Sequence, residues 1–235
     1  MIPVLIVPIL NGPDRLVRLL DSIDVPVARV TVIDNGDVVD RLIGGRSMYP
    51  FVIHVVKPGA NLGVAASWNL GIKCSSKAPY WVILNHDLVP GPGDLARLEA
   101  AVEPRANAVY YMLGMACFAV TPATIAKVGW FDENFIPAYD EDLDYSRRCD
   151  LAGVERIEAG FSGQHVGSAT IYADGGSLRL LNHLTHVQND KYYATKWGGR
   201  KQGGETFVSP FGVGEGVSAW TLDIERLRRQ TWPRT

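Results

Sequence analysis

The segment Asn85-His86-Asp87 places an amide, an imidazole and a carboxylate directly after the apolar run Tyr80–Leu84. A short apolar run bounded by turn residues indicates a strand buried on both faces, and such strands belong to parallel sheets covered by helices. Ligands of open α/β sheets bind just beyond the carboxyl ends of the strands. Asn85 and Asp87 could therefore hold a divalent cation at the rim of a site, although Asn and Asp also favour turns for local reasons.

A denser group of carboxylates lies among aromatic side chains in the segment Asp132–Asp144. A helix that begins near Asp140 would place Asp142 and Asp144 close to its N-terminus, where the helix dipole favours their ionised forms. These carboxylates could take part in a reaction there. The alternative is a cluster of capping and salt-bridge contacts with the arginines that follow, Arg147 and Arg148.

The elements that would position these groups begin with three apolar runs, Ile2–Ile9, Val30–Ile33 and Phe51–Val56, which we interpret as strands. A helix after Pro13 separates the first two, so they form a parallel crossover unit. Asp34 then follows the carboxyl end of a strand, where acidic residues often bind a ribose or a base edge. A simple turn residue is the alternative for Asp34.

The rest of the chain continues the alternation of helices and strands. We expect a helix at Asp94–Val102, one or two strands within Ala108–Val120, a helix at Pro122–Val128, an edge strand at Gly153–Ile157 and a helix at Leu178–His186. Asn69 shares a small-residue helical face with Ala65 and Ala66, so it is either a buried packing residue or a ligand contact. The pattern predicts an α/β fold with a mostly parallel central sheet and helices on both faces.

Composition excludes several classes of protein. The 235-residue chain, with 47% hydrophobic residues, fits one large domain or one domain with a small appendage. Its net charge of −2 provides no basic field for direct nucleic-acid binding. The opening run Ile2–Leu10 is too short to span a membrane and lacks a basic start, so we expect neither a signal peptide nor a transmembrane segment. Three widely spaced cysteines suit a reducing compartment, and we expect a cytoplasmic protein.

Several short motifs together resemble family 2 glycosyltransferases of the GT-A fold, especially their rhamnosyltransferase-like branch. They are Asp34-Asn35-Gly36, Asn61-Leu62-Gly63, Asn69-Leu70-Gly71, Asn85-His86-Asp87, Gly129–Phe135 with Tyr139–Arg148, Gln164–Ser168, and Tyr192-Tyr193-Ala194-Thr195-Lys196-Trp197-Gly198. The resemblance implies one GT-A domain over residues 1–200, with a Rossmann-like nucleotide-binding half at 1–103 and an acceptor-side, catalytic half at 104–200. Residues 201–235 would add a glycine-rich loop and a basic C-terminal tail.

The resemblance also implies roles for individual residues. Asp142 would be the catalytic base, and Asp87 and His165 would bind Mn²⁺ or Mg²⁺. Asn85 replaces the first Asp of the family's Asp-any-Asp motif, but an amide can still bond a sugar hydroxyl. The donor nucleotide would contact Pro8, Asp34, Asn61, Asn69, Asn85 and Arg200. The acceptor side would include Trp130, Glu141, Asp144 and Arg147.

The implied reaction is metal-dependent transfer of a sugar from a nucleotide-diphosphate sugar to an acceptor hydroxyl, with inversion. A sugar-phosphate nucleotidyltransferase is one alternative, but it requires a glycine-rich basic loop after the first strand, and Asn11–Arg15 has one glycine. A non-catalytic module that binds a sugar nucleotide or glycan is another. The acceptor could be a glycan, a protein, a lipid-linked molecule or a small molecule, and the sequence does not define the oligomeric state.

The glycine-rich stretch Gly198–Gly216 is either a linker or a lid. Phe207 and Phe211 could cover a bound sugar, and Arg200 and Lys201 could meet the diphosphate. We therefore expect this stretch to be mobile without ligand and ordered with donor and metal.

Overall fold

The computed structural model describes residues 1–39, 49–167, 170 and 177–213. The strands are β1 (Leu5–Ile9), β2 (Arg29–Asp34), β3 (Val52–Val56), β4 (Trp81–Leu84), β5 (Leu88–Val89), β6 (Ala108–Leu113), β7 (Cys117–Val120), β8 (Glu155–Glu158) and β9 (Gln164–His165). The helices are α1 (Pro13–Asp21), α3 (Val64–Lys73), α4 (Asp94–Ala101), α5 (Pro122–Val128), α6 (Glu141–Leu151) and α8 (Ser177–Trp197), with a 3-10 turn, η1, at Pro210–Gly212.

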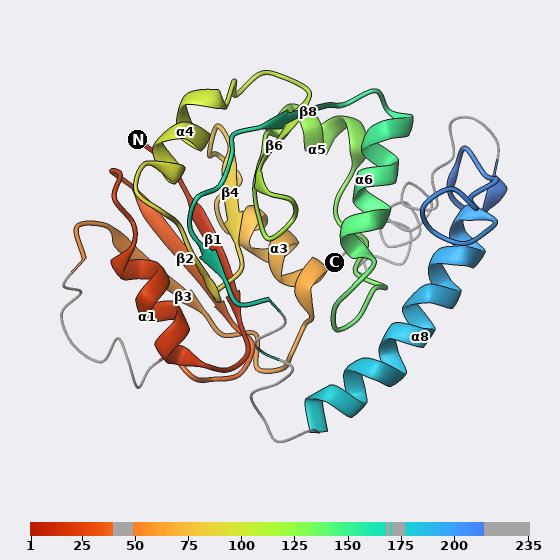
Figure 1. Ribbon diagram of the computed structural model, residues 1–235, viewed down its shortest axis with the longest axis horizontal. Coiled ribbons are helices and arrows are strands. Elements are labelled where there is room, and N and C mark those ends of the chain that lie inside the picture. Colours follow the sequence, from red (N-terminus) through yellow and green to blue (C-terminus); the bar gives the residue numbers. More distant parts are fainter. Residues whose placement is uncertain (40–48, 168–169, 171–176, 214–235) are drawn as a thin grey trace, which may run out of the picture.

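Seven of these strands form one twisted sheet in the order β3-β2-β1-β4-β7-β6-β8 (Figure 1). β3, β2, β1 and β4 are parallel, whereas β7 runs antiparallel to both β4 and β6. β8 pairs in parallel with β6. The predicted α/β fold with a mostly parallel sheet is therefore confirmed, and the stretch Ala108–Val120 is a hairpin of two strands.

Helices cover both faces of the sheet because alternate strand residues point to opposite sides. Leu5, Val7 and Ile9 of β1 pack in one apolar core with the buried leucines of α1 and α4. Val4 and Ile6 pack in a second core with α3, α5 and α6. This two-sided burial explains why the central strands lack polar alternation in the sequence.

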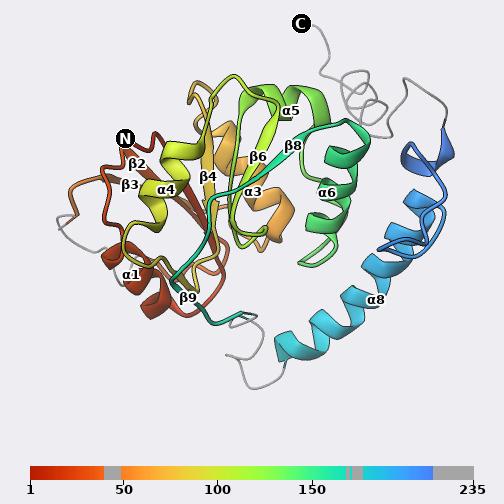
Figure 2. The ribbon, with the colours of Figure 1, turned by 45° about the horizontal axis from the view of Figure 1, so that its top comes forward.

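α8 lies outside α6, on the opposite side of the molecule from α1 in both Figure 1 and Figure 2. A small apolar cluster of Phe135, Tyr193 and Trp197 fastens its C-terminal end. The helix continues well beyond the predicted end at His186, because it meets no helix-breaking residue before Gly198, which adopts φ 70°. No described helix has both the length and the apolarity needed to cross a membrane.

The residues that follow α8 pack back onto the domain. Lys201 pairs with Asp140 at 2.6 Å and with Asp190 at 2.8 Å. Arg147 donates to the carbonyl oxygen of Phe207 at 2.7 Å. The described part of the predicted lid, up to residue 213, thus contacts α6 and α8. The end of the glycine-rich stretch and the basic tail lie outside the described residues.

Candidate active site

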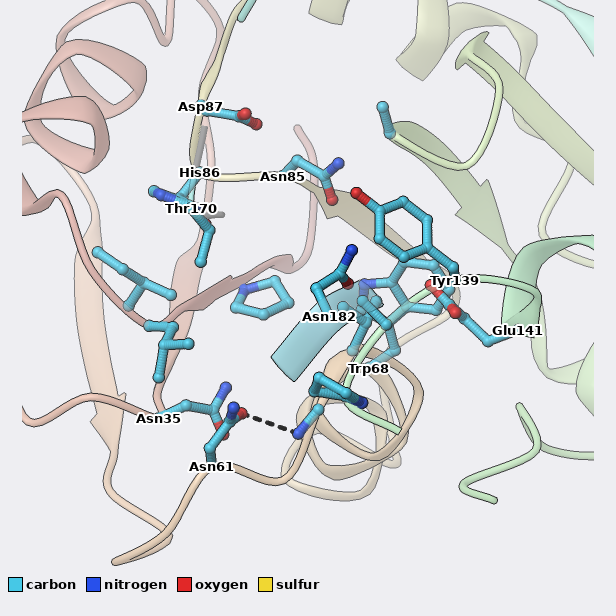
Figure 3. Close-up of a pocket in the computed structure, with 18 of the residues that line it drawn as sticks. Asn35, Asn61, Trp68, Asn85, His86, Asp87, Tyr139, Glu141, Thr170 and Asn182 are labelled. Atoms are coloured by element: carbon cyan, nitrogen blue, oxygen red, sulfur yellow. Dashed lines mark hydrogen bonds between the residues drawn. The ribbon is translucent and has the colours of Figure 1, made fainter. Parts of the chain in front are cut away.

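A cavity of about 360 Å³ opens at the carboxyl ends of the central parallel strands (Figure 3). Pro8 lines it from β1, Asn35 from the end of β2, and Asn85 and Asp87 from the end of β4. The opposite wall comes from the segment before α6 and from the first half of α8. The switch from parallel to antiparallel order beside β4 leaves this space open, as expected of ligand sites in α/β sheets.

Asp87 and His165 are brought together by a short antiparallel pair of strands. Leu88 of β5 faces His165 of β9 in the ladder. Nε2 of His165 lies 3.3 Å from Oδ1 of Asp87, and both residues line the cavity. A carboxylate oxygen and an imidazole nitrogen suit Mn²⁺, and a carboxylate oxygen also suits Mg²⁺. No cluster of three or more metal-binding side chains forms within the described ranges, so a cation here would take its other ligands from phosphate or water.

His86 connects the metal-binding segment to the loop after β1. Nε of Arg15 donates to Nε2 of His86 at 3.3 Å, and Nη2 of Arg15 donates to Oδ1 of Asn11 at 2.8 Å. Burial lowers the pKa of His86 to about 4, against the opposing charge of Asp87, so the ring is neutral at pH 7. Sequence reasoning gave His86 and Arg15 no role. The signal was available, because His86 lies between the two residues of the motif.

The N-terminus of α6 brings two carboxyl groups to the cavity, those of Glu141 and Asp142. Asp142 is half-buried, and its Oδ1 accepts from the backbone N–H of Leu143 at 2.8 Å. Glu141 is 5% exposed. Burial, followed by the charge of Asp142, raises the pKa of Glu141 well above its ordinary value of 4.5. In Figure 3 the Glu141 carboxyl group lies near Tyr139, apart from Asp87.

Asp144 and Arg147, predicted on the acceptor side, do not line the cavity. Asp144 is fully buried and accepts from Nε of Arg148 at 2.9 Å and from Nε1 of Trp197 at 3.0 Å, while Lys196 pairs with it at 2.6 Å. Two residues along a helix correspond to a rotation of about 200°. Asp144 therefore faces away from the side that Asp142 presents, and its contacts are those of the salt-bridge alternative.

Three further predicted residues also lie outside the cavity lining. Asp34 accepts from the backbone N–H groups of Val38 and Val39, both at 3.0 Å, so it fixes the turn after β2. Trp130 packs at the edge of the core with Lys73 above its ring at 5.1 Å. Arg200 is exposed at the end of α8.

Asn69 is fully buried and binds the motif around Phe131. Its amide donates to the carbonyl oxygen of Phe131 and to Oε1 of Glu133, both at 2.8 Å. Its Oδ1 accepts from the backbone N–H of Phe131 at 3.1 Å. The packing interpretation of Asn69 therefore accounts for its contacts.

Other predicted donor-side residues do line the cavity: Pro8, Asn61 and Asn85. Asn35 lies beside them, although sequence reasoning assigned the role to its neighbour Asp34. The Asn35 amide donates to Oγ of Ser67 at 2.9 Å, and its Oδ1 accepts from the backbone N–H of Leu62 at 3.0 Å. Tyr139 and Asn182 also line the cavity. Tyr139 begins the Tyr139–Arg148 motif, whereas Asn182 carried no distinguishing sequence signal.

The segment before α6 is held in an uncommon backbone conformation. Tyr139 and Asp140 have φ values of 78° and 71°, in the left-handed region that non-glycine residues rarely adopt. Nδ2 of Asn189 donates to the carbonyl oxygens of Ala138 at 2.9 Å and Tyr139 at 3.0 Å. Lys201 bonds Asp140 from the other side at 2.6 Å. These contacts from α8 and the following loop fix the backbone that presents Tyr139, and next to it the two α6 carboxyl groups, to the cavity.

Solved structures share this architecture at low sequence identity. One is GalNAc-T7, crystallised with UDP, GalNAc and Mn²⁺ (TM-score 0.60, 12% identity, 83% of this chain and 50% of that chain covered). Another is S. aureus TarS residues 1–349 in complex with UDP-GlcNAc (TM-score 0.52, 14% identity, 80% of this chain and 66% of that chain covered). These neighbours confirm the predicted GT-A fold. The chain spans half to two thirds of their lengths.

Sequence comparisons agree with the fold. A galactofuranosyl glycosyltransferase of Leishmania donovani is 50% identical over 42 residues, which is 18% of this chain and 10% of that protein. The model of the family described as glycosyl transferase family 2 matches residues 4–131, more than half of the 235-residue chain. The matched region includes β1 to α5 and the whole Asn85-His86-Asp87 motif. The chain therefore belongs to glycosyl transferase family 2.

Proposed function

We propose that the protein transfers a sugar from a uridine diphosphate sugar to an acceptor hydroxyl, with the help of Mn²⁺ or Mg²⁺ and with inversion. The observation that carries this proposal is the cavity at the carboxyl ends of the strands. It brings the Asp87–His165 pair and the half-buried carboxylate of Asp142 to one space. The solved neighbours support the choice of nucleotide, since TarS and GalNAc-T7 were crystallised with UDP or a UDP sugar.

The Asp87–His165 pair would hold the cation. A cation bound there would neutralise the charge that develops on the leaving diphosphate. Asn35, Asn61 and Asn85 line the side of the cavity formed by the first strands, where the nucleoside would lie. Their amides offer both donors and acceptors to ribose and base.

Asp142 would take the proton from the acceptor hydroxyl as that oxygen attacks the anomeric carbon. A positioned base of this kind contributes about 10²–10⁴-fold to the rate. The backbone N–H of Leu143 bonds Oδ1 of Asp142, which leaves Oδ2 as the oxygen that would accept the proton. Direct displacement assisted by one base inverts the anomeric centre.

Retention through a covalent intermediate would need a second, ionised carboxylate as nucleophile. Glu141 is the neighbouring carboxyl group in the cavity, and burial raises its pKa well above 4.5. A protonated carboxyl group is a poor nucleophile. This supports the inverting course.

A transfer assay tests the proposal. The purified protein is incubated with each of several radiolabelled UDP sugars and Mn²⁺, and release of UDP is measured with and without a mixed glycan acceptor. We expect UDP release from at least one sugar, loss of release with EDTA, and strong reduction in Asp142→Asn. Binding of UDP sugars without any release would favour a non-catalytic binding module. Formation of a UDP sugar from UTP and a sugar phosphate would favour a nucleotidyltransferase.

A further inference from the structure

Glu141 lines the cavity and has one unpaired carboxyl oxygen. The residue is 5% exposed, and its Oε2 has no hydrogen-bond partner among the described residues. Trp68 lines the same cavity, and its Nε1 is likewise buried without a partner in the described part of the chain. A buried polar atom without a partner destabilises the protein, because it has lost its hydrogen bonds to water. A bound ligand would remove that destabilisation.

The charges around Glu141 oppose its ionisation. Asp140 and Asp142 flank it in sequence, and both carboxylates act to raise its pKa. Lys201, which contacts the neighbouring Asp140, is paired with Asp140 and Asp190. The backbone N–H groups of Tyr139 and Glu141 act in the opposite direction, and burial outweighs them.

No lysine or arginine lines the cavity among the described residues, so no such side chain offsets these effects. Asp87 adds a further carboxyl group to the lining. His165 is paired with Asp87, and Tyr139 supplies a phenol. The N-terminus of α6 favours negative charge, but Asp142 already occupies the same turn.

We propose that Glu141 enters the reaction as a neutral carboxylic acid and donates a hydrogen bond from Oε2 to an oxygen of the sugar in the bound UDP sugar. This inference rests on the proposed function. Glu141 and Asp142 then differ in role although they are neighbours in sequence. An ionised carboxylate only accepts hydrogen bonds, whereas a protonated one also donates. Glu141 would then donate a hydrogen bond to the sugar, while the neighbouring carboxylate of Asp142 would act as the base.

A direct test measures the protonation of Glu141 in the free protein. The protein is labelled with ¹³C at the glutamate side-chain carboxyls, and the resonance that is missing in Glu141→Gln is assigned to Glu141. We expect its chemical shift to titrate well above 4.5, the ordinary pKa of the group. A midpoint at or below that value overturns the proposal. This readout needs no substrate, so it judges the inference even if the protein transfers no sugar.

A binding test examines the hydrogen bond itself. Calorimetry with Mn²⁺ compares UDP with UDP-GlcNAc and UDP-galactose for the wild type, Glu141→Gln and Glu141→Ala. The gain in affinity that the sugar provides should fall roughly 3- to 10-fold in Glu141→Ala, the loss of one hydrogen bond. Glutamine keeps an N–H donor at this position and should retain most of that gain.

Three outcomes separate the possible failures. Equal loss in Glu141→Gln and Glu141→Ala would mean that the ionised form of Glu141 binds the sugar, and would overturn the proposal. No effect in Glu141→Ala would overturn it as well. Failure of the wild type to bind UDP or either sugar nucleotide would refute the proposed function, while the carboxyl titration would still decide the protonation state of Glu141.

Discussion

Replacement of Asp144 by asparagine should destabilise the protein without a direct effect on chemistry. Asp144 is fully buried and compensates two buried cations, Arg148 at 2.9 Å and Lys196 at 2.6 Å. Removal of one partner from a buried ion pair typically costs 3–5 kcal/mol, because the remaining charge is left uncompensated. The structure places Asp144→Asn at the lower end of this range. Lys196 keeps Asp132 at 2.6 Å, and Arg148 keeps two backbone carbonyl acceptors.

We therefore expect Asp144→Asn to lose about 3 kcal/mol of unfolding free energy. That is a large part of the roughly 5–15 kcal/mol that a folded protein has, so the variant should remain folded at 25 °C with a clearly lower midpoint in urea. Asp142→Asn is the matched control, because it lies two positions earlier in the same helix and faces the cavity. Its unfolding free energy should stay within about 1 kcal/mol of the wild type. Native stability of Asp144→Asn together with loss of turnover would refute this assignment of the two faces of α6.

Three other predictions concern the cation, the acid limit and the loop after α8. Asp87→Ala should abolish the thermal stabilisation that UDP provides in the presence of Mn²⁺. Asp150→Ala, at an exposed site, is the control and should retain this stabilisation. Full retention in Asp87→Ala would show that the cation binds elsewhere. His86 has a pKa lowered from 6.5 to about 4, so its contribution to stability is complete above pH 6.5 and is lost as the pH falls towards 4, by up to about 3 kcal/mol. Urea unfolding between pH 7 and pH 4.5 should show a flatter pH dependence in His86→Gln, and identical slopes would contradict the lowered pKa. Lys201→Ala removes two ion pairs, so chymotrypsin should cleave this variant after Phe207 faster than it cleaves the wild type. Lys201→Arg should be cleaved nearly as slowly as the wild type. Equal cleavage rates in all three proteins would show that Lys201 does not anchor this loop.

The sequence predicted the elements whose signals are local. Apolar runs such as Tyr80–Leu84 and Val30–Ile33 gave the parallel strands, and the carboxyl end of β4 gave Asp87. Residue spacing also placed Asp142 near a helix N-terminus, where the structure has it. The antiparallel position of β7 in the sheet could not be predicted, because strand order depends on long-range packing rather than on any local pattern.

The sequence could not predict whether a given polar side chain faces the cavity or packs inside the protein. Asp142 and Asp144 have the same local chemistry, and only the packing of α8 against α6 shows that Lys196 and Trp197 bind the second of them. Asp34 and Asn35 are adjacent at the end of β2, yet backbone turn contacts occupy the first and the cavity receives the second. Such choices depend on contacts between residues far apart in sequence.

The central claim is that Asp142 acts in the transfer step and not in nucleotide binding. The most direct measurement compares Asp142→Asn with the wild type in two assays, calorimetric affinity for UDP with Mn²⁺ and the turnover rate from the UDP sugar that the wild type uses. The account predicts an affinity for UDP within a factor of about two and a turnover rate lower by about 10² or more. Turnover close to that of the wild type, or loss of UDP affinity equal to the loss of turnover, would contradict it.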